Sequence, residues 1–262
     1  MAKKRTKHDV LSHEKKVRHA HHHNKGKTID LSVIIPAYNE EKRIVKTLRS
    51  IDGYLEKQPY NYEIIVVANN STDNTDSVVR SYQKSVEHLR LYDLRIAKPG
   101  GAKGYAVKKG VEEARGRYVV FMDADNATRI TEIKAFWPHF ERGAKVVIGS
   151  RHIQGSRIPV PQPFRRRLLG RLGNYIIRFF LLPGITDTQC GFKAFEKNVA
   201  KKIFRKSVIG GWGFDMEILA LAKYFGHTII EVPITWYDIG GSRLQAGKAA
   251  RDTLRELFKI RT

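Results

Sequence analysis

Apolar and polar positions along the chain form two kinds of segment that alternate. In the first kind nearly every residue is apolar, which is typical of a strand buried on both faces of a sheet. In the second kind apolar residues recur every three or four positions, as on one face of a helix. The predicted strands are 31–38 (LSVIIPAY), 62–68 (YEIIVVA), 89–96 (LRLYDLRI, which alternates), 117–123 (RYVVFMD), 144–151 (AKVVIGSR) and 227–236 (HTIIEVPITW).

Helical spacing follows most of these strands. The segment 39–55 begins with Asn39, which we expect to cap a helix, and spaces Ile44, Leu48 and Ile51 at helical intervals. Strands that alternate with helices predict an α/β fold with a mostly parallel central sheet and helices on both faces. The other predicted helices lie within 69–86, 100–115, 210–226 and 246–262.

In sheets of this kind, ligands bind in the crevice beyond the carboxyl ends of the strands. Polar or glycine-rich residues follow five of the predicted strands, and we expect them to converge on one crevice. They are Pro36 to Glu40, Asn69 to Asp73, Gly100 to Gly104, Asp123 to Asn126, and Ser150 with Arg151.

The chain has 262 residues and a net charge of +22. This charge predicts an anionic partner, such as nucleic acid, an anionic membrane surface or a phosphorylated substrate. Residues 1–29 are rich in Lys, Arg and His, which predicts a disordered basic arm. Residues 30–245 are expected to form the folded domain, and residues 246–262 an amphipathic C-terminal helix. No apolar run approaches the ~20 residues of a membrane span. The single cysteine, Cys190, fits a reducing cytoplasm.

Two carboxylates, Asp123 and Asp125, follow the apolar run 118–122. A hard cation such as Mg²⁺ or Mn²⁺ takes one or two carboxylates and completes its shell with phosphate oxygens, which suits a nucleoside diphosphate leaving group. Taken alone, the same stretch (DADNAT) also fits an Asx-turn with a helix cap. The segment 100–106 (GGAKGYA) follows a strand and begins a helix. It could therefore cradle phosphates, or simply form a tight turn with a surface lysine.

The order and spacing of several motifs resemble the family 2 glycosyltransferases, which have a GT-A fold. The motifs in the first half are LSVIIPAYNEE, EIIVVANNSTDNT, GGAKGYAVKKG, YVVFMDADNAT and VVIGSR. In the second half, RLGNYIIRFFLLPGITDTQCGFKAF and GWGFDMEILALAKYFGHTIIEVPITWYDIGGSR resemble the dolichyl-phosphate glucosyltransferase and polyprenyl-phosphate mannosyltransferase branch. The resemblance spans roughly residues 30–245.

The resemblance implies a role for individual residues, with Asp125, Arg151 and Asp215 as the catalytic ones. Those implied to line the nucleotide pocket are Pro36, Tyr38, Glu40, Asn69, Lys103 and Asp123. Asp123 and Asp125 would bind the metal and the diphosphate. Arg151 would meet an acceptor phosphate, helped by Arg165, Arg166 and Arg167, and Asp187 and Asp215 would face the donor sugar or acceptor. From the sequence alone, Asp215 fits a helix N-cap equally well.

Two positions depart from the family's pattern. The second strand of these enzymes commonly ends in two aspartates, whereas here Asn69 and Asn70 follow Ala68. An asparagine can accept a hydrogen bond from uracil N3–H without a charge, so the nucleobase is left open. Mannosyltransferases often have a polar metal ligand two residues after the second aspartate. Here that position is Ala127, as in the glucosyltransferase version.

The implied reaction is metal-dependent, inverting transfer of a hexose, glucose or mannose, from a UDP- or GDP-sugar to a polyprenyl phosphate. A phosphate acceptor is already ionised near neutral pH and needs arginines rather than a base. A saccharide or protein hydroxyl acceptor, the main alternative, would need a base, for which Asp215 is the candidate. A nucleotidyltransferase would want a glycine-rich signature after the first strand, where PAYNEE stands. No specific nucleic acid is expected, since no nucleic-acid-binding signature accompanies the charge.

The expected location is the cytoplasmic face of a membrane, to which the chain binds peripherally. Within 165–183, apolar residues recur at helical spacing with Arg171 and Arg178 among them. A buried helix would show the same apolar spacing, but an interfacial helix explains the arginines better. The C-terminal helix could bind beside it, and the basic arm could lie along anionic headgroups.

Overall fold

The computed structural model describes residues 28–97, 102–160 and 181–239. The basic arm up to residue 27, the three arginines Arg165, Arg166 and Arg167, and the predicted C-terminal helix lie outside the described residues. None of the described helices is both long enough and apolar enough to cross a membrane.

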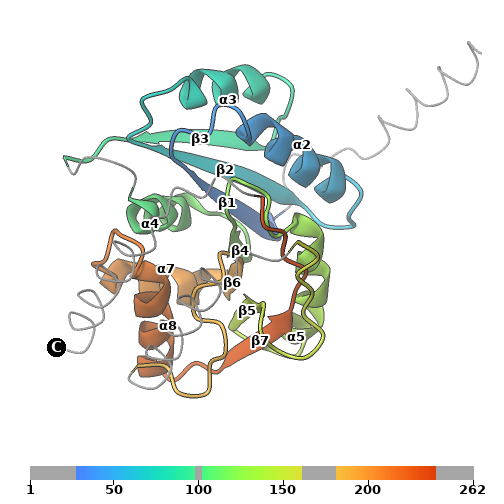
Figure 1. The fold of residues 1–262 in the computed structure, drawn as a ribbon, viewed down its shortest axis with the longest axis vertical. Helices are drawn as coiled ribbons and strands as arrows, with labels where there is room; N and C mark the ends of the chain where they lie inside the picture. Colours follow the sequence, from blue (N-terminus) through green and yellow to red (C-terminus); the bar gives the residue numbers. More distant parts are fainter. Residues whose placement is uncertain (1–27, 98–101, 161–180, 240–262) are drawn as a thin grey trace, which may run out of the picture.

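Within these ranges the core is a seven-stranded sheet with the strand order β3-β2-β1-β4-β6-β5-β7 (Figure 1). Every strand except β6 runs in the same direction, which confirms the predicted mostly parallel sheet. The strands are β1 (Leu31–Ala37), β2 (Tyr62–Asn69), β3 (Leu89–Leu94), β4 (Tyr118–Phe121), β5 (Val146–Ser150), β6 (Lys193–Glu196) and β7 (Ile229–Pro233).

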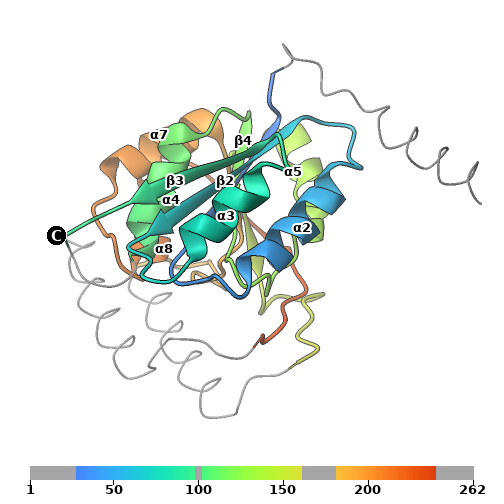
Figure 2. The same cartoon turned by 90° about the horizontal axis from the view of Figure 1, so that it is seen from above.

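Helices cover both faces of the sheet, as Figures 1 and 2 show. Because side chains of a strand alternate between faces, Val33 and Ile35 of β1 pack in the core beneath α2, α3 and α5, whereas Ile34 packs in the core beneath α4, α7 and α8. The helices are α2 (Ile44–Leu55), α3 (Thr75–Gln83), α4 (Lys103–Glu113), the 3₁₀ helix η1 (Ile130–Ala135), α5 (Trp137–Glu141), α7 (Lys197–Lys206) and α8 (Phe214–Tyr224).

The predicted cap at Asn39 is wrong. Helix α2 begins at Ile44, after Arg43, whose side chain makes no capping bond. Asn39 instead has φ 55°, in the left-handed region that asparagine tolerates. Its side-chain oxygen accepts the backbone N–H of Thr72 at 2.7 Å. Asn39 therefore ties the loop after β1 to the loop after β2.

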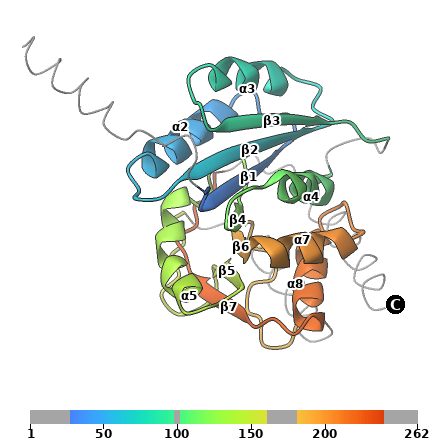
Figure 3. The same ribbon diagram turned by 180° about the vertical axis from the view of Figure 1, so that it is seen from behind.

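No pattern in the sequence predicted strand β6, which matters for the site. It is antiparallel to both of its neighbours, and its first residue, Lys193, lies opposite Phe121, the last residue of β4. The reversal places Lys193 at the carboxyl edge of the parallel strands, two residues from Asp123 along the direction of β4. Figure 3 shows β6 between β4 and β5.

Candidate active site

The loops after β1 and β2 meet, as expected for residues at one edge of a parallel sheet. The backbone N–H of Glu40 donates to the Thr75 hydroxyl at 2.7 Å. Both carboxylate oxygens of Glu40 accept hydrogen bonds from Arg43, each at 2.7 Å. Pro36 and Tyr38, at the end of β1, are partly exposed on the same edge. The predicted nucleotide-pocket residues of the first loop thus lie together in a braced turn.

Asn69 ends β2 and is almost completely buried, with 1 % of its surface exposed. Its side-chain oxygen accepts the backbone N–H of Ala102 at 2.5 Å, which ties β2 to the start of α4. The side-chain nitrogen is buried without a hydrogen-bond partner. Because an amide oxygen has two lone pairs, the bond to Ala102 leaves it able to accept a second hydrogen bond. The role of Asn69 towards uracil N3–H stays a prediction.

Asp123 lies beyond the end of β4 and is paired with Lys103, the first residue of α4. Lys103 Nζ lies 2.6 Å from Asp123 Oδ1, and it lies 5.8 and 5.7 Å from the ring centroids of Trp212 and Phe214. Burial alone would lower the pKa of Lys103, but Asp123 and Asp215 outweigh it, and the pKa lies above its ordinary value. Lys103 is therefore a fixed positive charge within the crevice.

The absence of a side chain at Gly191 leaves space for the carboxylate of Asp123. A Cβ atom at Gly191 would overlap Oδ2 of Asp123 and lie 2.7 Å from its Cγ. Any other residue at this position would push the carboxylate away. The side chain of Asp123 keeps 39 % of its surface exposed, so one oxygen pairs with Lys103 while the group remains open to a ligand.

Asp125 forms the Asx-turn that its sequence allowed, since its Oδ1 accepts the backbone N–H of Ala127 at 2.9 Å. It caps no helix, because η1 begins at Ile130 after Arg129. Burial, and next the charge of Asp123, raise the pKa of Asp125. The nearby cations Arg43 and Lys103 act in the opposite direction, and burial and Asp123 outweigh them.

The two carboxylates fit a divalent cation. Hard cations prefer carboxylate oxygens, and the carboxylates of Asp123 and Asp125 lie close enough to interact electrostatically. In the parts of the chain that the structure describes, no cluster of three or more His, Cys, Asp or Glu side chains is arranged to hold a metal. A metal at Asp123 and Asp125 would therefore complete its shell from the substrate diphosphate and water.

Arg151 and Asp187, which were predicted as separate site residues, form one unit. Asp187 accepts hydrogen bonds from the backbone N–H, Nε and Nη2 of Arg151 at 2.9, 2.7 and 2.9 Å. The Arg151 guanidinium also lies 5.6 Å from the centroid of the Trp236 ring. Burial would raise the pKa of Asp187, but the adjacent guanidinium outweighs it and holds the pKa well below its usual range.

Glu231 supports this unit from β7. Its two carboxylate oxygens accept the backbone N–H groups of Thr186 and Asp187 at 2.7 and 2.9 Å. These bonds fix the turn from which Asp187 reaches Arg151. Sequence reasoning missed Glu231; its only signal was a charged residue inside an otherwise apolar predicted strand, IIEVP.

Asp215 is held by a buried lysine that sequence reasoning also missed. The N-cap of α8 is Gly213, so the capping role left open for Asp215 is not observed. Its carboxylate lies 2.5 Å from Lys193 Nζ, and Lys193 also donates to the carbonyl of Cys190 at 2.6 Å. Lys193 has no exposed surface and Asp215 only 3 %. The reversed strand β6 is what brings the lysine here.

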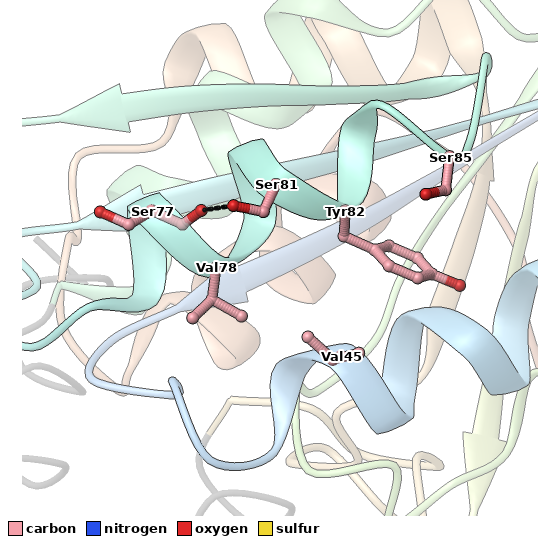
Figure 4. A pocket seen from close by; sticks show the side chains of 6 residues that line it. All are labelled: Val45, Ser77, Val78, Ser81, Tyr82 and Ser85. Carbon is pink, nitrogen blue, oxygen red and sulfur yellow. Dashed lines mark hydrogen bonds between the residues drawn. The ribbon is translucent and has the colours of Figure 1, made fainter.

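A hollow elsewhere on the molecule takes no part in this constellation. It has a volume of about 380 Å³ and lies between α2 and α3 (Figure 4). Its lining is uncharged and comprises Val45, Ser77, Val78, Ser81, Tyr82 and Ser85. It offers no cation to an anionic ligand and no carboxylate to a metal.

The model of glycosyl transferase family 2 matches residues 32–204. The chain belongs to this family. Dolichyl-phosphate beta-glucosyltransferase of Drosophila melanogaster is 36 % identical over 248 residues, which cover 89 % of this chain and 74 % of the relative. The human enzyme of the same name is 32 % identical over 232 residues, covering 83 % and 70 %, and that of Saccharomyces cerevisiae 32 % over 254 residues, covering 91 % and 76 %.

Solved structures agree on the fold. Glucosyl-3-phosphoglycerate synthase from Mycobacterium tuberculosis, in complex with Mn²⁺, uridine diphosphate and phosphoglyceric acid, superposes with a TM-score of 0.63 at 19 % sequence identity, covering 88 % of this chain and 78 % of that one. The same enzyme with Mn²⁺, UDP-glucose and phosphoglyceric acid gives a TM-score of 0.62 at 18 % identity, covering 88 % and 79 %. The predicted GT-A fold and glycosyltransferase class are thus confirmed.

Proposed function

We propose that this glycosyltransferase moves glucose from a nucleotide sugar to a polyprenyl phosphate, with inversion, at the cytoplasmic face of a membrane. Its relatives named dolichyl-phosphate beta-glucosyltransferase support the sugar and the acceptor. UDP-glucose and Mn²⁺ in the structures of the glucosyl-3-phosphoglycerate synthase support a UDP donor and a divalent metal.

One observation supports a phosphate acceptor most directly. Three carboxylates of the crevice face a cation: Asp123 lies 2.6 Å from Lys103, Asp187 2.7 Å from Arg151, and Asp215 2.5 Å from Lys193. A carboxylate held in this way is a poor general base, because accepting a proton would break its ion pair. A hydroxyl acceptor would need such a base, whereas a phosphate monoester is already ionised near neutral pH.

Catalysis in this scheme is positioning and electrostatic stabilisation. An acceptor phosphate oxygen attacks the anomeric carbon while the bond from that carbon to the nucleoside diphosphate breaks, which inverts the anomeric centre. Lys103 faces the charge that develops on the diphosphate, and Arg151, held rigidly by Asp187, orients the acceptor phosphate. Asp123 and Asp125 would hold the metal, which neutralises part of the leaving group's charge when bound.

The test is a transfer assay with radiolabelled sugars. UDP-glucose, GDP-mannose and other donors are offered to a polyprenyl phosphate, with and without Mn²⁺. The expected result is chloroform-extractable label from UDP-glucose that is lost with EDTA and in Asp125→Ala. The exposed carboxylate of Glu141, at the end of α5, provides the matched control Glu141→Ala. Transfer only to water-soluble acceptors would overturn the proposal.

A further inference from the structure

The loop between α7 and α8, residues 207–213, exposes apolar side chains next to the crevice. Val208 has 71 % of its surface exposed and Trp212 46 %, whereas Ile209 between them is 7 % exposed. Tyr105 on α4, 37 % exposed, extends the same patch and lies within 3.4 Å of the Val208 carbonyl. Figure 1 shows this loop beside the start of α4. Contiguous exposed apolar residues of this kind mark interaction surfaces.

The exposure is built into the fold. Both oxygens of the buried Glu217 carboxylate accept backbone N–H groups of the loop, from Val208 at 2.8 Å and Ile209 at 2.9 Å. The backbone N–H of Gly104 donates to the Gly210 carbonyl at 3.0 Å. These bonds turn Ile209 into the core and Val208 outward. A partner that binds this loop finds it already ordered, so little conformational entropy is lost on binding.

The loop adjoins the crevice through Trp212. Its ring centroid lies 5.8 Å from Lys103 Nζ, which itself is 2.6 Å from Asp123. A lipid-linked acceptor must present its phosphate to this crevice while its hydrocarbon chain stays in a bilayer. The apolar loop therefore lies where the protein would have to approach that bilayer.

Charge on α7 indicates which kind of surface the loop fits. The helix reads KNVAKKIFRK and contains no acidic residue. Arg205 and Lys206, in its last turn directly before the loop, are both exposed. An apolar tip flanked by exposed cations is complementary to an anionic bilayer, where cations meet headgroup phosphates and apolar side chains enter the acyl boundary. Tryptophan is well suited to such an interface because its ring is amphipathic.

We propose that the α7–α8 loop is a docking element for an anionic bilayer. Val208 and Trp212 enter the boundary between headgroups and acyl chains, and Arg205 and Lys206 contact headgroup phosphates. The inference rests on the proposed function in one respect: an enzyme that uses a lipid-linked acceptor must approach a membrane. It concerns an element distinct from the basic arm, residues 165–183 and the C-terminal helix.

Tryptophan fluorescence tests the contact directly. The chain has three tryptophans, so Trp137→Phe/Trp236→Phe leaves Trp212 as the only reporter. The probe is a vesicle of equimolar phosphatidylcholine and phosphatidylglycerol without polyprenyl phosphate. We expect the Trp212 emission to shift to shorter wavelength and to be quenched when the phosphatidylcholine carries brominated acyl chains. Flotation with the vesicles without any change in Trp212 emission would overturn the proposal, as would quenching only when polyprenyl phosphate is added.

Surface variants measure the contribution of each part. Val208→Ser/Trp212→Ser should weaken vesicle binding by about tenfold, and Arg205→Ser/Lys206→Ser by about twentyfold at low salt, with less effect at high salt. The control is Tyr224→Ser: Tyr224 is 82 % exposed, and α8 places it about 16 Å from the loop. Equal binding by the loop variant and the control would contradict the docking role.

The transfer assay, run in detergent with a short-chain polyprenyl phosphate, separates this inference from the proposed function. If transfer is absent and Trp212 is quenched, the proposed function is wrong and the docking element is supported. Efficient transfer together with an unquenched Trp212 removes the docking element and leaves the function in place.

Discussion

The buried pair of Lys193 and Asp215 leads to a prediction about stability. Replacing Lys193 by Met keeps the volume of the side chain close to that of lysine but removes the only cation within hydrogen-bonding distance of Asp215 in the described structure. Because Asp215 is only 3 % exposed, solvent cannot replace the lost partner. Removing one member of a buried ion pair costs about 3–5 kcal/mol.

The second variant, Lys193→Met/Asp215→Asn, separates the lost charge pairing from the change of side chain. It should recover much of the loss, because no unpaired charge remains buried.

Urea unfolding near neutral pH, followed by circular dichroism, measures these differences. Lys223→Met is the matched control: Lys223 lies on the surface of α8 and donates only to the Pro183 carbonyl, at 2.9 Å. Its change in the free energy of unfolding should stay within about 0.5 kcal/mol. A deficit below about 1 kcal/mol for Lys193→Met, or a double variant as unstable as the single one, would refute the electrostatic account.

Two further changes test the crevice. In Gly191→Ala the new Cβ overlaps Asp123 and displaces its carboxylate. We therefore expect kcat/KM for transfer to fall by about 100-fold, with Tm nearly unchanged. A wild-type rate would contradict the position assigned to the Asp123 carboxylate. Asp187, whose pKa is depressed in the folded state, contributes stability that is complete above about pH 4 and is lost progressively as the pH falls below it. The urea midpoint should therefore drop in acid, and Asp187→Asn should flatten that drop; equal acid slopes in both proteins would show that Asp187 does not cause it.

The buried sheet and the crevice were predictable because their signals are local. Apolar runs such as 31–35 and 64–68 become strands with almost no exposed surface. Parallel strands place their carboxyl ends at one edge, so Asp123, Lys103 and Asn69 had to lie close to one another. The contacts from Lys103 to Asp123 and from Ala102 to Asn69 confirm that convergence.

The errors arise where a residue's role depends on a distant part of the chain. Asn39 is a residue type that often caps helices, but its side chain binds Thr72 in the next loop instead. β6 has four residues and begins with a lysine, so neither length nor apolar pattern predicted a strand there. Without β6, nothing indicated that Lys193 would be buried against Asp215, whose own sequence context suggested a cap.

The ion pairs of the crevice also bear on the meaning of the net charge of +22. Lys103, Arg151 and Lys193 are each matched by an aspartate, so the described residues of the crevice hold little excess positive charge. Such pairing fixes the side chains in advance, which favours catalysis by preorganised charges. Exposed cations also lie on other described surfaces, of which α7 is one example. Positive charge on such surfaces attracts an anionic partner, and salt screens this attraction. The paired charges of the crevice are partly shielded from solvent, so salt weakens their interactions less. Raising the ionic strength should therefore weaken the association of the protein with anionic vesicles much more than it slows transfer to an acceptor dissolved in detergent.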